Sequence, residues 1–399
     1  MKGQKIMIVA GGEWQVPIIK KAKQLGLRVM NTNLYQDSPG FQYADESAVA
    51  DVLDYKTNLQ IAEAYKPNAI ITDQSDIAVK TVARLCERLK LKGITEKIAD
   101  LFTNKYLMRM FCKEHGFDIP RFELCCSLQE AETASEKIGY PLVMKPLRNQ
   151  SSRGVFVVYN KAELFQKFNL TLQFSESGEV LVEEFIDGKE FTVEGFMFSD
   201  RHISLAVSAK DYLKDNIAIA TRLVYSHENF DFNYDCLKIQ NNNLVETMKL
   251  PFGITHAEYK YKEGRFYLIE IAARGGGTKI SSDIVPLVSG VDVNELLIRS
   301  ALGEEIKSGD ISLMQKSVAI LDFFILPTGR VKSIIGAEEI TMIPGVVDFK
   351  LNFKAGDTIS TPNDDRSRVG YYIAHASYKE SLLSLAEYIK LKLKVIYDE

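Results

Sequence analysis

The chain has 399 residues, 46% of them hydrophobic and 26% charged, a composition typical of globular proteins with full-sized cores. Its 49 Lys and Arg against 53 Asp and Glu give a net charge of −4, without the basic excess of proteins that bind nucleic acid or anionic membranes. The apolar runs are strand-sized, shorter than the ~20 residues of a membrane span, and no secretory signal opens the chain. Five cysteines and five scattered histidines form no zinc motif, so we expect a cytoplasmic protein with reduced thiols.

The first hundred residues alternate strands with helices. The apolar spacing predicts strands at 5–10, 27–30 and 69–72, and helices at 14–25, 57–65 and 77–89. Such alternation predicts a parallel sheet whose ligands lie at the carboxyl ends of the strands. Gly11 and Gly12 follow the first strand, but no G-x-G-x-x-G is present and no acidic residue ends the second strand, which disfavours a dinucleotide site.

Antiparallel hairpins mixed with helices follow the α/β region. Three strand pairs are predicted, at 141–145 with 155–159, 180–185 with 190–198, and 256–261 with 265–271. The last ninety residues mix strands at 318–326, 346–353 and 369–376 with a helix at 379–393. The fold class is therefore α/β and α+β. We divide the chain into domains at 1–100, 101–310 and 311–399.

Two glutamates are predicted to face each other in the hairpin HAEYKYKEGRFYLIEIAARGGG. If the turn centres on Gly264, residues whose numbers sum to 528 are opposite, and Glu258 and Glu270 are such a pair. Like charges in this position favour a cation between them, and Mg²⁺ suits two carboxylates. A slipped register, or neutralisation by Lys260 or Arg265, is the alternative.

Arg274 follows the second glutamate and leads into three glycines. Its guanidinium there suits a carboxylate or a developing oxyanion.

A polar turn follows the strand that ends at Lys145. Residues 148–154 of VMKPLRNQSSRGVFVV offer backbone N–H groups and nearby cations, as an anion-binding nest does, although a solvated hairpin tip has the same composition. Lys105, on a predicted helix at 103–115, is equally compatible with a solvated helix face.

A third acidic motif is LVEEFIDGKEFTVEG. Glu183 and Glu190 flank its turn at Asp187 and Gly188, either as edge-strand acids in water or with Glu190 accepting hydrogen bonds from a ribose.

In this order, the four motifs resemble the ATP-grasp superfamily. That family has a helix lysine, a strand lysine before a phosphate loop, an E-E-[FY]-[IV]-x-G-x-E hairpin and two magnesium carboxylates. The run of Ala272, Ala273 and Arg274 is similar to the branch of bacterial L-amino-acid ligases and other carboxylate–amine ligases. The resemblance implies an N-terminal Rossmann-like (pre-ATP-grasp) domain, a two-lobed ATP-grasp core with its phosphate-loop lobe at about 120–185, and a C-terminal α+β subdomain.

The resemblance also implies roles for single residues. It implies that ATP phosphates are bound by a set of cationic and small residues: Lys105, Lys145, Arg148, Ser151, Ser152 and Gly154. It places a main-chain adenine site at Glu183, Glu184, Phe185 and Ile186, and the ribose at Glu190. Glu258 and Glu270 would hold Mg²⁺ or Mn²⁺, with Ala272 replacing an asparagine ligand of many members, and Arg274 and Lys145 would be catalytic.

By the same resemblance, the protein activates a small carboxylate as an acyl phosphate and couples it to an amine, releasing ADP and phosphate. An ATP-grasp carboxylase using bicarbonate and a non-catalytic ATP-binding protein are the alternatives. The expected partners are these small substrates, with a homodimer possible. Lys210, Arg222, His256, Gly276 and Gly277 are candidate substrate residues, within an acceptor site drawn from 11–15, 73–76, 210–212 and 275–279; solvated or structural roles are their alternatives.

Overall fold

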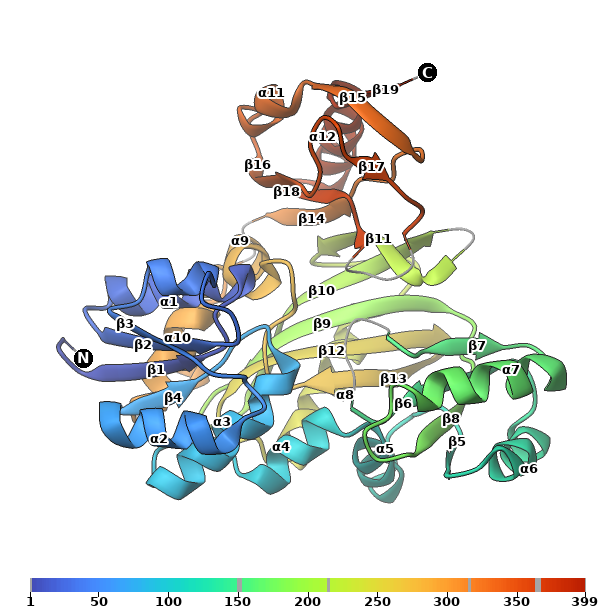
Figure 1. The fold of residues 1–399 in the computed structure, drawn as a ribbon, viewed down its shortest axis with the longest axis horizontal. Coiled ribbons are helices and arrows are strands. Elements are labelled where there is room, and N and C mark those ends of the chain that lie inside the picture. The colour runs from blue at the N-terminus through green and yellow to red at the C-terminus, as the bar shows by residue number, and fades with distance from the viewer. Residues whose placement is uncertain (1, 149–152, 214–215, 315–316, 363–366, 399) are drawn as a thin grey trace.

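The computed structural model describes residues 2–148, 153–213, 216–314, 317–362 and 367–398. The strands of these residues form four sheets, arranged as Figure 1 shows. Among the described helices, none combines the length and the apolar character that crossing a lipid bilayer requires.

The N-terminal sheet is parallel, as the sequence predicts, with strand order β3-β2-β1-β4. Its strands are β1 (Lys5–Val9), β2 (Arg28–Asn33), β3 (Glu46–Val49) and β4 (Ala69–Ile71). On one face, Ile6 and Ile8 pack with α1 (Val16–Gln24) and α10 (Val293–Ala301). On the other, Met7 and Val9 pack with α2 (Tyr55–Tyr65) and α3 (Asp76–Leu89).

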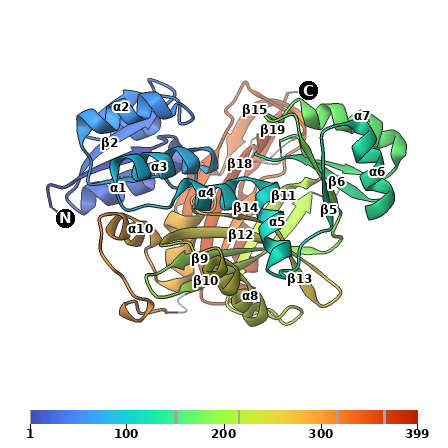
Figure 2. The same ribbon diagram turned by 90° about the horizontal axis from the view of Figure 1, so that it is seen from below.

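A small antiparallel sheet lies on the far side of the molecule from the N-terminal sheet (Figures 1 and 2). Its order is β5-β8-β6-β7, and its strands are β5 (Phe122–Cys125), β6 (Leu142–Pro146), β7 (Phe156–Val158) and β8 (Val180–Glu184). Helices α6 (Leu128–Ile138) and α7 (Lys161–Leu172) share its apolar core. The chain reaches it through α4 (Glu96–Thr103) and α5 (Lys105–Glu114), where the Asn104 side chain caps α5 by accepting from two backbone N–H groups.

The central sheet has eight strands in the order β13-β12-β9-β10-β11-β14-β18-β16. They are β9 (Lys189–Met197), β10 (His202–Leu213), β11 (Asn216–Ser226), β12 (Gly253–Lys262), β13 (Arg265–Ala272), β14 (Val318–Phe323), β16 (Val346–Leu351) and β18 (Gly370–Ala376). Helix α8 (Tyr234–Thr247) covers the apolar face of β9 and β12. The strands come from both sides of residue 310, where we predict a domain boundary.

The remaining elements pack around the central sheet or form a separate three-stranded sheet. After β13 the chain forms a π-helix, η3 (Ile280–Ile284), and α9 (Val285–Ser289). Beyond β14, a three-stranded sheet contains β15 (Gly329–Ile335), β17 (Thr358–Ile359) and β19 (Lys394–Tyr397), with the short helix α11 (Ala337–Thr341). Helix α12 (Lys379–Lys392) packs Leu382, Ala386 and Ile389 against β14 and β18.

Two of the three predicted strand pairs are confirmed, and one is wrong. β6 pairs with β7, and β12 pairs with β13. The strands around Asp187 and Gly188, however, belong to different sheets, because β8 pairs with β5 and β6 while β9 pairs with β10 and β12. The turn residues Asp187 and Gly188 therefore connect a strand of the small sheet to a strand of the central sheet rather than two strands of one hairpin.

Candidate active site

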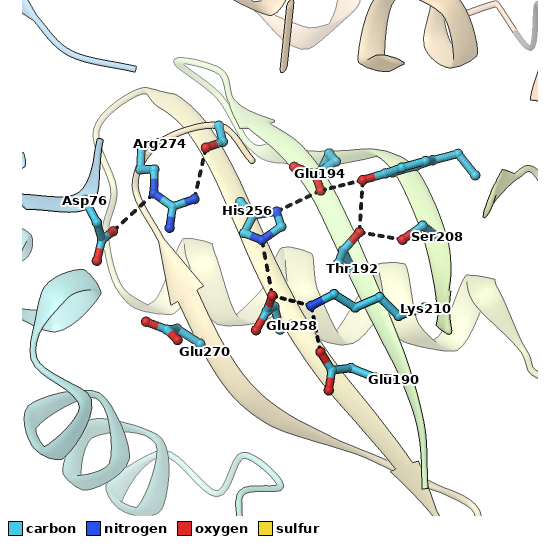
Figure 3. Close-up of polar contacts among 12 residues, drawn as sticks. Asp76, Glu190, Thr192, Glu194, Ser208, Lys210, His256, Glu258, Glu270 and Arg274 are labelled. Atoms are coloured by element: carbon cyan, nitrogen blue, oxygen red, sulfur yellow. Dashed lines mark hydrogen bonds and ion pairs between the residues drawn. The ribbon is translucent and has the colours of Figure 1, made fainter. Parts of the chain in front are cut away.

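One face of the central sheet is polar where β9, β10, β12 and β13 lie side by side (Figure 3). Because side chains alternate between the faces of a strand, Phe191 and Val193 enter the core with α8, whereas Glu190, Thr192 and Glu194 lie on the other face. Strand register adds neighbours on the same face: Ser208, Lys210, His256, Glu258 and Glu270.

Glu258 and Glu270 are directly opposite in this face, as the sequence predicts. Each carboxylate binds a lysine from another element. Lys210 Nζ on β10 lies 2.7 Å from Glu258 Oε1 and 2.8 Å from Glu190 Oε1. Lys105 Nζ at the start of α5 lies 2.8 Å from Glu270 Oε1. The predicted ribose acid, the two predicted metal acids and two predicted lysines therefore form one continuous group.

The counter-ions proposed as alternatives lie elsewhere. Lys260 Nζ is 4.8 Å from the ring centroid of Phe185, and exposed Arg265 pairs with Asp118 at 3.4 Å. Lysines from β10 and α5, remote in sequence from the hairpin, neutralise the glutamates instead.

The two glutamates have the chemistry of magnesium ligands. Burial raises the pKa of Glu258, but Lys210 and His256 lower it by more than burial raises it. The net pKa is therefore well below its usual value, and the carboxylate stays ionised. Mg²⁺ commonly takes one or two carboxylates and completes its shell with water and phosphate oxygens. Within the described ranges, no three or more His, Cys, Asp and Glu side chains gather as a metal site, so the pair does not form a cage of protein ligands.

His256 lies between two carboxylates on the polar face. Its Nδ1 is 2.8 Å from Glu194 Oε1, and its Nε2 is 3.6 Å from Glu258 Oε1. Burial lowers the pKa of His256, but Glu194 outweighs this and the pKa rises to about 9. Gly276 lies beside it, since a Cβ there would be 3.0 Å from His256 Nδ1. Near neutral pH this imidazole is therefore a cation rather than a base.

Arg274 extends from the end of β13 towards the N-terminal sheet. Its Nε donates to Asp76 Oδ1 at 3.2 Å and its Nη1 to the carbonyl of Gly275 at 3.0 Å. Burial raises the pKa of Asp76, and the nearby Arg274 opposes that rise. The predicted catalytic arginine thus lies where the N-terminal sheet meets the polar face.

Lys145 belongs to a buried ion-pair group on the small sheet. Lys145 Nζ is 2.5 Å from Glu183 Oε2, and Arg109 Nε is 2.7 Å from Glu183 Oε1. Burial raises the pKa of Glu183, but Arg109 and Lys145 lower it by more than burial raises it, so the net pKa lies below its usual value. Burial lowers the pKa of Lys145. Glu183, predicted near adenine, thus fixes a predicted phosphate ligand through its side chain.

Arg109 also contacts the bulge that aligns the glutamate pair. Near the hairpin turn, the numbers of opposite residues sum to 527. A bulge at Ile269 shifts the register by one residue, so that Glu258 and Glu270, whose numbers sum to 528, are opposite. The carbonyl of Ile269 accepts a hydrogen bond from Arg109 Nη2 at 2.7 Å. The predicted register is therefore right at the glutamates although the turn is not centred on Gly264.

The other predicted nucleotide residues surround the junction of the small and central sheets. Glu184 pairs with Arg121 at 3.0 Å, Ile186 is buried, and Phe185 carries Lys260 over its ring.

At the loop after β6, Arg148 Nη2 donates to Asp100 at 2.8 Å. Gly154 has φ +71° and lies tightly against Phe174. Ser151 and Ser152 lie outside the described residues.

Arg222 is separated from the other candidate substrate residues. Arg222 lies on β11, opposite Asp211 of β10. It therefore lies on the face of the sheet away from Lys210, the neighbour of Asp211 along β10. Its guanidinium binds Asp322 at 2.8 Å, and Asp322 also accepts from Tyr372 and Lys390. This cluster joins the central sheet to α12.

The sequence analysis did not predict several residues of the described site, among them Arg109, Glu194 and Tyr225. Arg109 lies one helical turn after Lys105, and that spacing could have placed both on one face of α5. Glu194 follows Glu190 by four residues, so strand alternation could have added it to the polar face. Tyr225, which donates to Glu194 at 3.2 Å, lies opposite Ser208 in the hairpin of β10 and β11, so a prediction of that hairpin could have placed it on the same face.

Two family models match this chain. Residues 138–283 match the ATP-grasp domain, and residues 322–398 match the L-amino acid ligase C-terminal domain 2. Among curated relatives, the "Uncharacterized protein y4rH" of Sinorhizobium fredii is 26% identical over 78% of this chain and 64% of its own length. A formate-dependent phosphoribosylglycinamide formyltransferase of Prochlorococcus marinus is 27% identical over 46% of this chain and 48% of its own length. The chain thus spans about half to two thirds of these relatives.

Solved structures share the fold at low sequence identity. An L-amino acid ligase from Bacillus licheniformis superposes with a TM-score of 0.86 at 20% identity, covering 100% of both chains. A phosphoribosylglycinamide synthetase from Anaerococcus prevotii superposes with a TM-score of 0.78 at 18% identity, again over 100% of both chains. Residues 138–283 therefore match an ATP-grasp domain, the C-terminal region matches that of the L-amino acid ligases, and the chain shares its fold with these solved structures.

Proposed function

We propose that this protein is an ADP-forming ligase that joins a small carboxylate to an amine. The observation that carries the proposal is the polar sheet face, where Glu258 and Glu270 are paired, each with its own lysine, beside Arg274. The match to the L-amino acid ligase C-terminal domain favours an amino acid among the substrates.

The residues support a two-step reaction. A carboxylate oxygen attacks the γ-phosphorus of ATP, and the bond to ADP breaks. The amine then attacks the acyl carbon, loses a proton and expels phosphate. Lys105 and Lys145 supply positive charge for the phosphates, and Glu190 suits the ribose hydroxyls. Glu258 and Glu270 would hold Mg²⁺, which supplies charge neutralisation for the phosphate oxygens when bound.

Arg274 is assigned to the acyl group. A guanidinium held by Asp76 and by the carbonyl of Gly275 is preorganised, so it can stabilise a developing oxyanion without reorienting during the reaction. Cationic His256, two residues before Glu258 on the same face, suits the carboxylate of a substrate. The predicted homodimer remains a proposal.

The test is release of phosphate from MgATP across a matrix of amino acids, small carboxylates and amines, with the nucleotide products resolved. ADP and phosphate that depend on a carboxylate–amine pair would support the proposal and identify the substrates. AMP and pyrophosphate would contradict it. ADP release that depends on bicarbonate alone would favour the carboxylase alternative, in line with N5-carboxyaminoimidazole ribonucleotide synthetase and biotin carboxylase among the structural neighbours.

A further inference from the structure

The segment after Arg274 has an unusual backbone. Three glycines lead into Thr278 and Lys279, which have φ of 55° and 60°, and the π-helix η3 starts at the next residue. Non-glycine residues in the left-handed region are strained, and such conformations persist only where the surroundings fix them. Residues 275–281 therefore need partners that hold them in place.

One carboxylate from the N-terminal sheet holds both ends of this segment. Asp73 lies just beyond β4 and is 0% exposed. Its Oδ1 accepts from the backbone N–H of Gly275 at 2.8 Å, and its Oδ2 accepts from the hydroxyl of Ser281 at 2.7 Å. The next residue, Gln74, accepts from the backbone N–H of Lys279 at 3.1 Å.

Asp73 is itself fixed. Its carbonyl accepts from Gln15 Nε2 at 2.8 Å, and Gln74 Nε2 donates to the carbonyl of Trp14 at 3.1 Å. The contact with the segment is also close, since a Cβ on Gly275 would lie 2.4 Å from Ser281 Cβ and 2.7 Å from Asp73 Oδ1. The backbone at Gly275 thus has little freedom to shift while Asp73 stays in place.

The same loop reaches the arginine of the site. Asp76, three residues after Asp73, binds Arg274 Nε, while Arg274 Nη1 donates to the carbonyl of Gly275. The guanidinium is therefore oriented by one contact to Asp76 and by a second to a peptide whose position Asp73 sets.

We propose that Asp73 is a positioning residue of this enzyme: its buried carboxylate fixes residues 275–281 so that Arg274 and the glycine backbone face the acyl group. The inference rests on the proposed ligase function. Asp73 acts through Arg274 and the glycines, because both of its carboxylate oxygens already accept hydrogen bonds from Gly275 and Ser281.

The test compares variants of Asp73 with a matched buried control in the full chain. Asp73→Ala removes both hydrogen bonds, Ser281→Ala removes one, and Asp73→Asn is nearly isosteric and can still accept from Gly275. Asn58→Ala is the control, because Asn58 on α2 is also 0% exposed and accepts a hydrogen bond from Thr32 of the N-terminal sheet at 2.9 Å. Each protein is measured for thermal stability, MgATP affinity, kcat, KM and amide hydrogen exchange of residues 275–281.

We expect Asp73→Ala to lower kcat at least tenfold, with MgATP affinity within twofold of wild type and exchange of the segment at least tenfold faster. Asp73→Asn should restore most of the kcat. Ser281→Ala should lower kcat about threefold, and it replaces Asp73→Ala in the comparison if that variant does not fold. Asn58→Ala should lower stability but leave kcat and segment exchange unchanged. Equal kcat losses in Asp73→Ala and Asn58→Ala, or unchanged exchange, would overturn the proposal.

The exchange measurement separates this proposal from the proposed function. A wild-type protein without ligase turnover would overturn the function. In that event, faster exchange in Asp73→Ala than in Asn58→Ala would still support the hold of Asp73 on the segment, and equal exchange would refute it.

Discussion

Replacing Glu183 by glutamine is expected to destabilise the small sheet strongly. The carboxylate lies 2.7 Å from Arg109 and 2.5 Å from Lys145, and the three side chains are 2%, 0% and 6% exposed. Removing its charge leaves two cations buried together, and breaking such a pair costs about 3–5 kcal/mol. The fraction unfolded should therefore rise by a factor of about 10²–10⁴, at about 1.4 kcal/mol per factor of ten.

The same sheet offers a matched control. Glu123 on β5 pairs with Lys137 at 3.4 Å, but these side chains are 45% and 62% exposed, so Glu123→Gln should cost at most about 1 kcal/mol. Unfolding by denaturant would be followed together with amide exchange of β6 and β8, since one region of a large chain can open by itself. The reasoning is refuted if Glu183→Gln costs no more than Glu123→Gln. If the cost comes from unpaired cations, adding Lys145→Met should recover part of it.

Three further predictions concern the site and its pH dependence. Glu270→Gln should abolish MgATP turnover in an ADP-release assay while the fold is retained, because it removes one of the two charges proposed to hold the metal. Glu263→Gln at the exposed hairpin turn is the control, and normal turnover in Glu270→Gln would contradict the metal assignment. Arg274→Ala should still bind MgATP in a calorimetric titration but form product about 10²–10³-fold more slowly, and unchanged amide synthesis would remove it from the mechanism. Burial raises the pKa of Glu183, but Arg109 and Lys145 lower it below 4.5 in the folded protein. The stabilisation that the ionised carboxylate gives should therefore be present above pH 4.5 and be lost as the pH falls through the lower folded pKa. Circular dichroism should show a steeper loss of structure in acid for wild type than for Glu183→Gln, and parallel curves would contradict this.

The N-terminal sheet was predictable because its signals are local. Strands β1, β2 and β4 each contain a short apolar run and the helices have apolar faces, so periodicity locates these elements and their alternation implies parallel pairing. Sites formed by consecutive strands, such as the pair of Glu258 and Glu270, share this advantage. Strand β3, whose sequence ESAV is mostly exposed, was not predicted.

The partners of these residues were less accessible from sequence. At the bulge that aligns the two glutamates, the carbonyl of Ile269 accepts a hydrogen bond from Arg109, 160 residues away. Likewise, the turn at Asp187 and Gly188 has the local chemistry of a hairpin, while the hydrogen-bonding partners of the flanking strands lie on other strands of two sheets. Local pattern cannot report such long-range choices.

Arg109 has a mechanical consequence that follows from its two contacts. Its guanidinium donates to Glu183 on the small sheet and to the carbonyl of Ile269 on the central sheet. Among the described residues, no strand of the small sheet pairs with the central sheet, whereas β11 and β14 are joined by a backbone ladder from Arg222 to Tyr225. Moving the small sheet against the central sheet would therefore break no strand pairing, whereas moving the C-terminal strands would break a ladder. Arg109 accordingly links the sheet that carries Lys145 to the strand that carries Glu270 through the two contacts of one side chain.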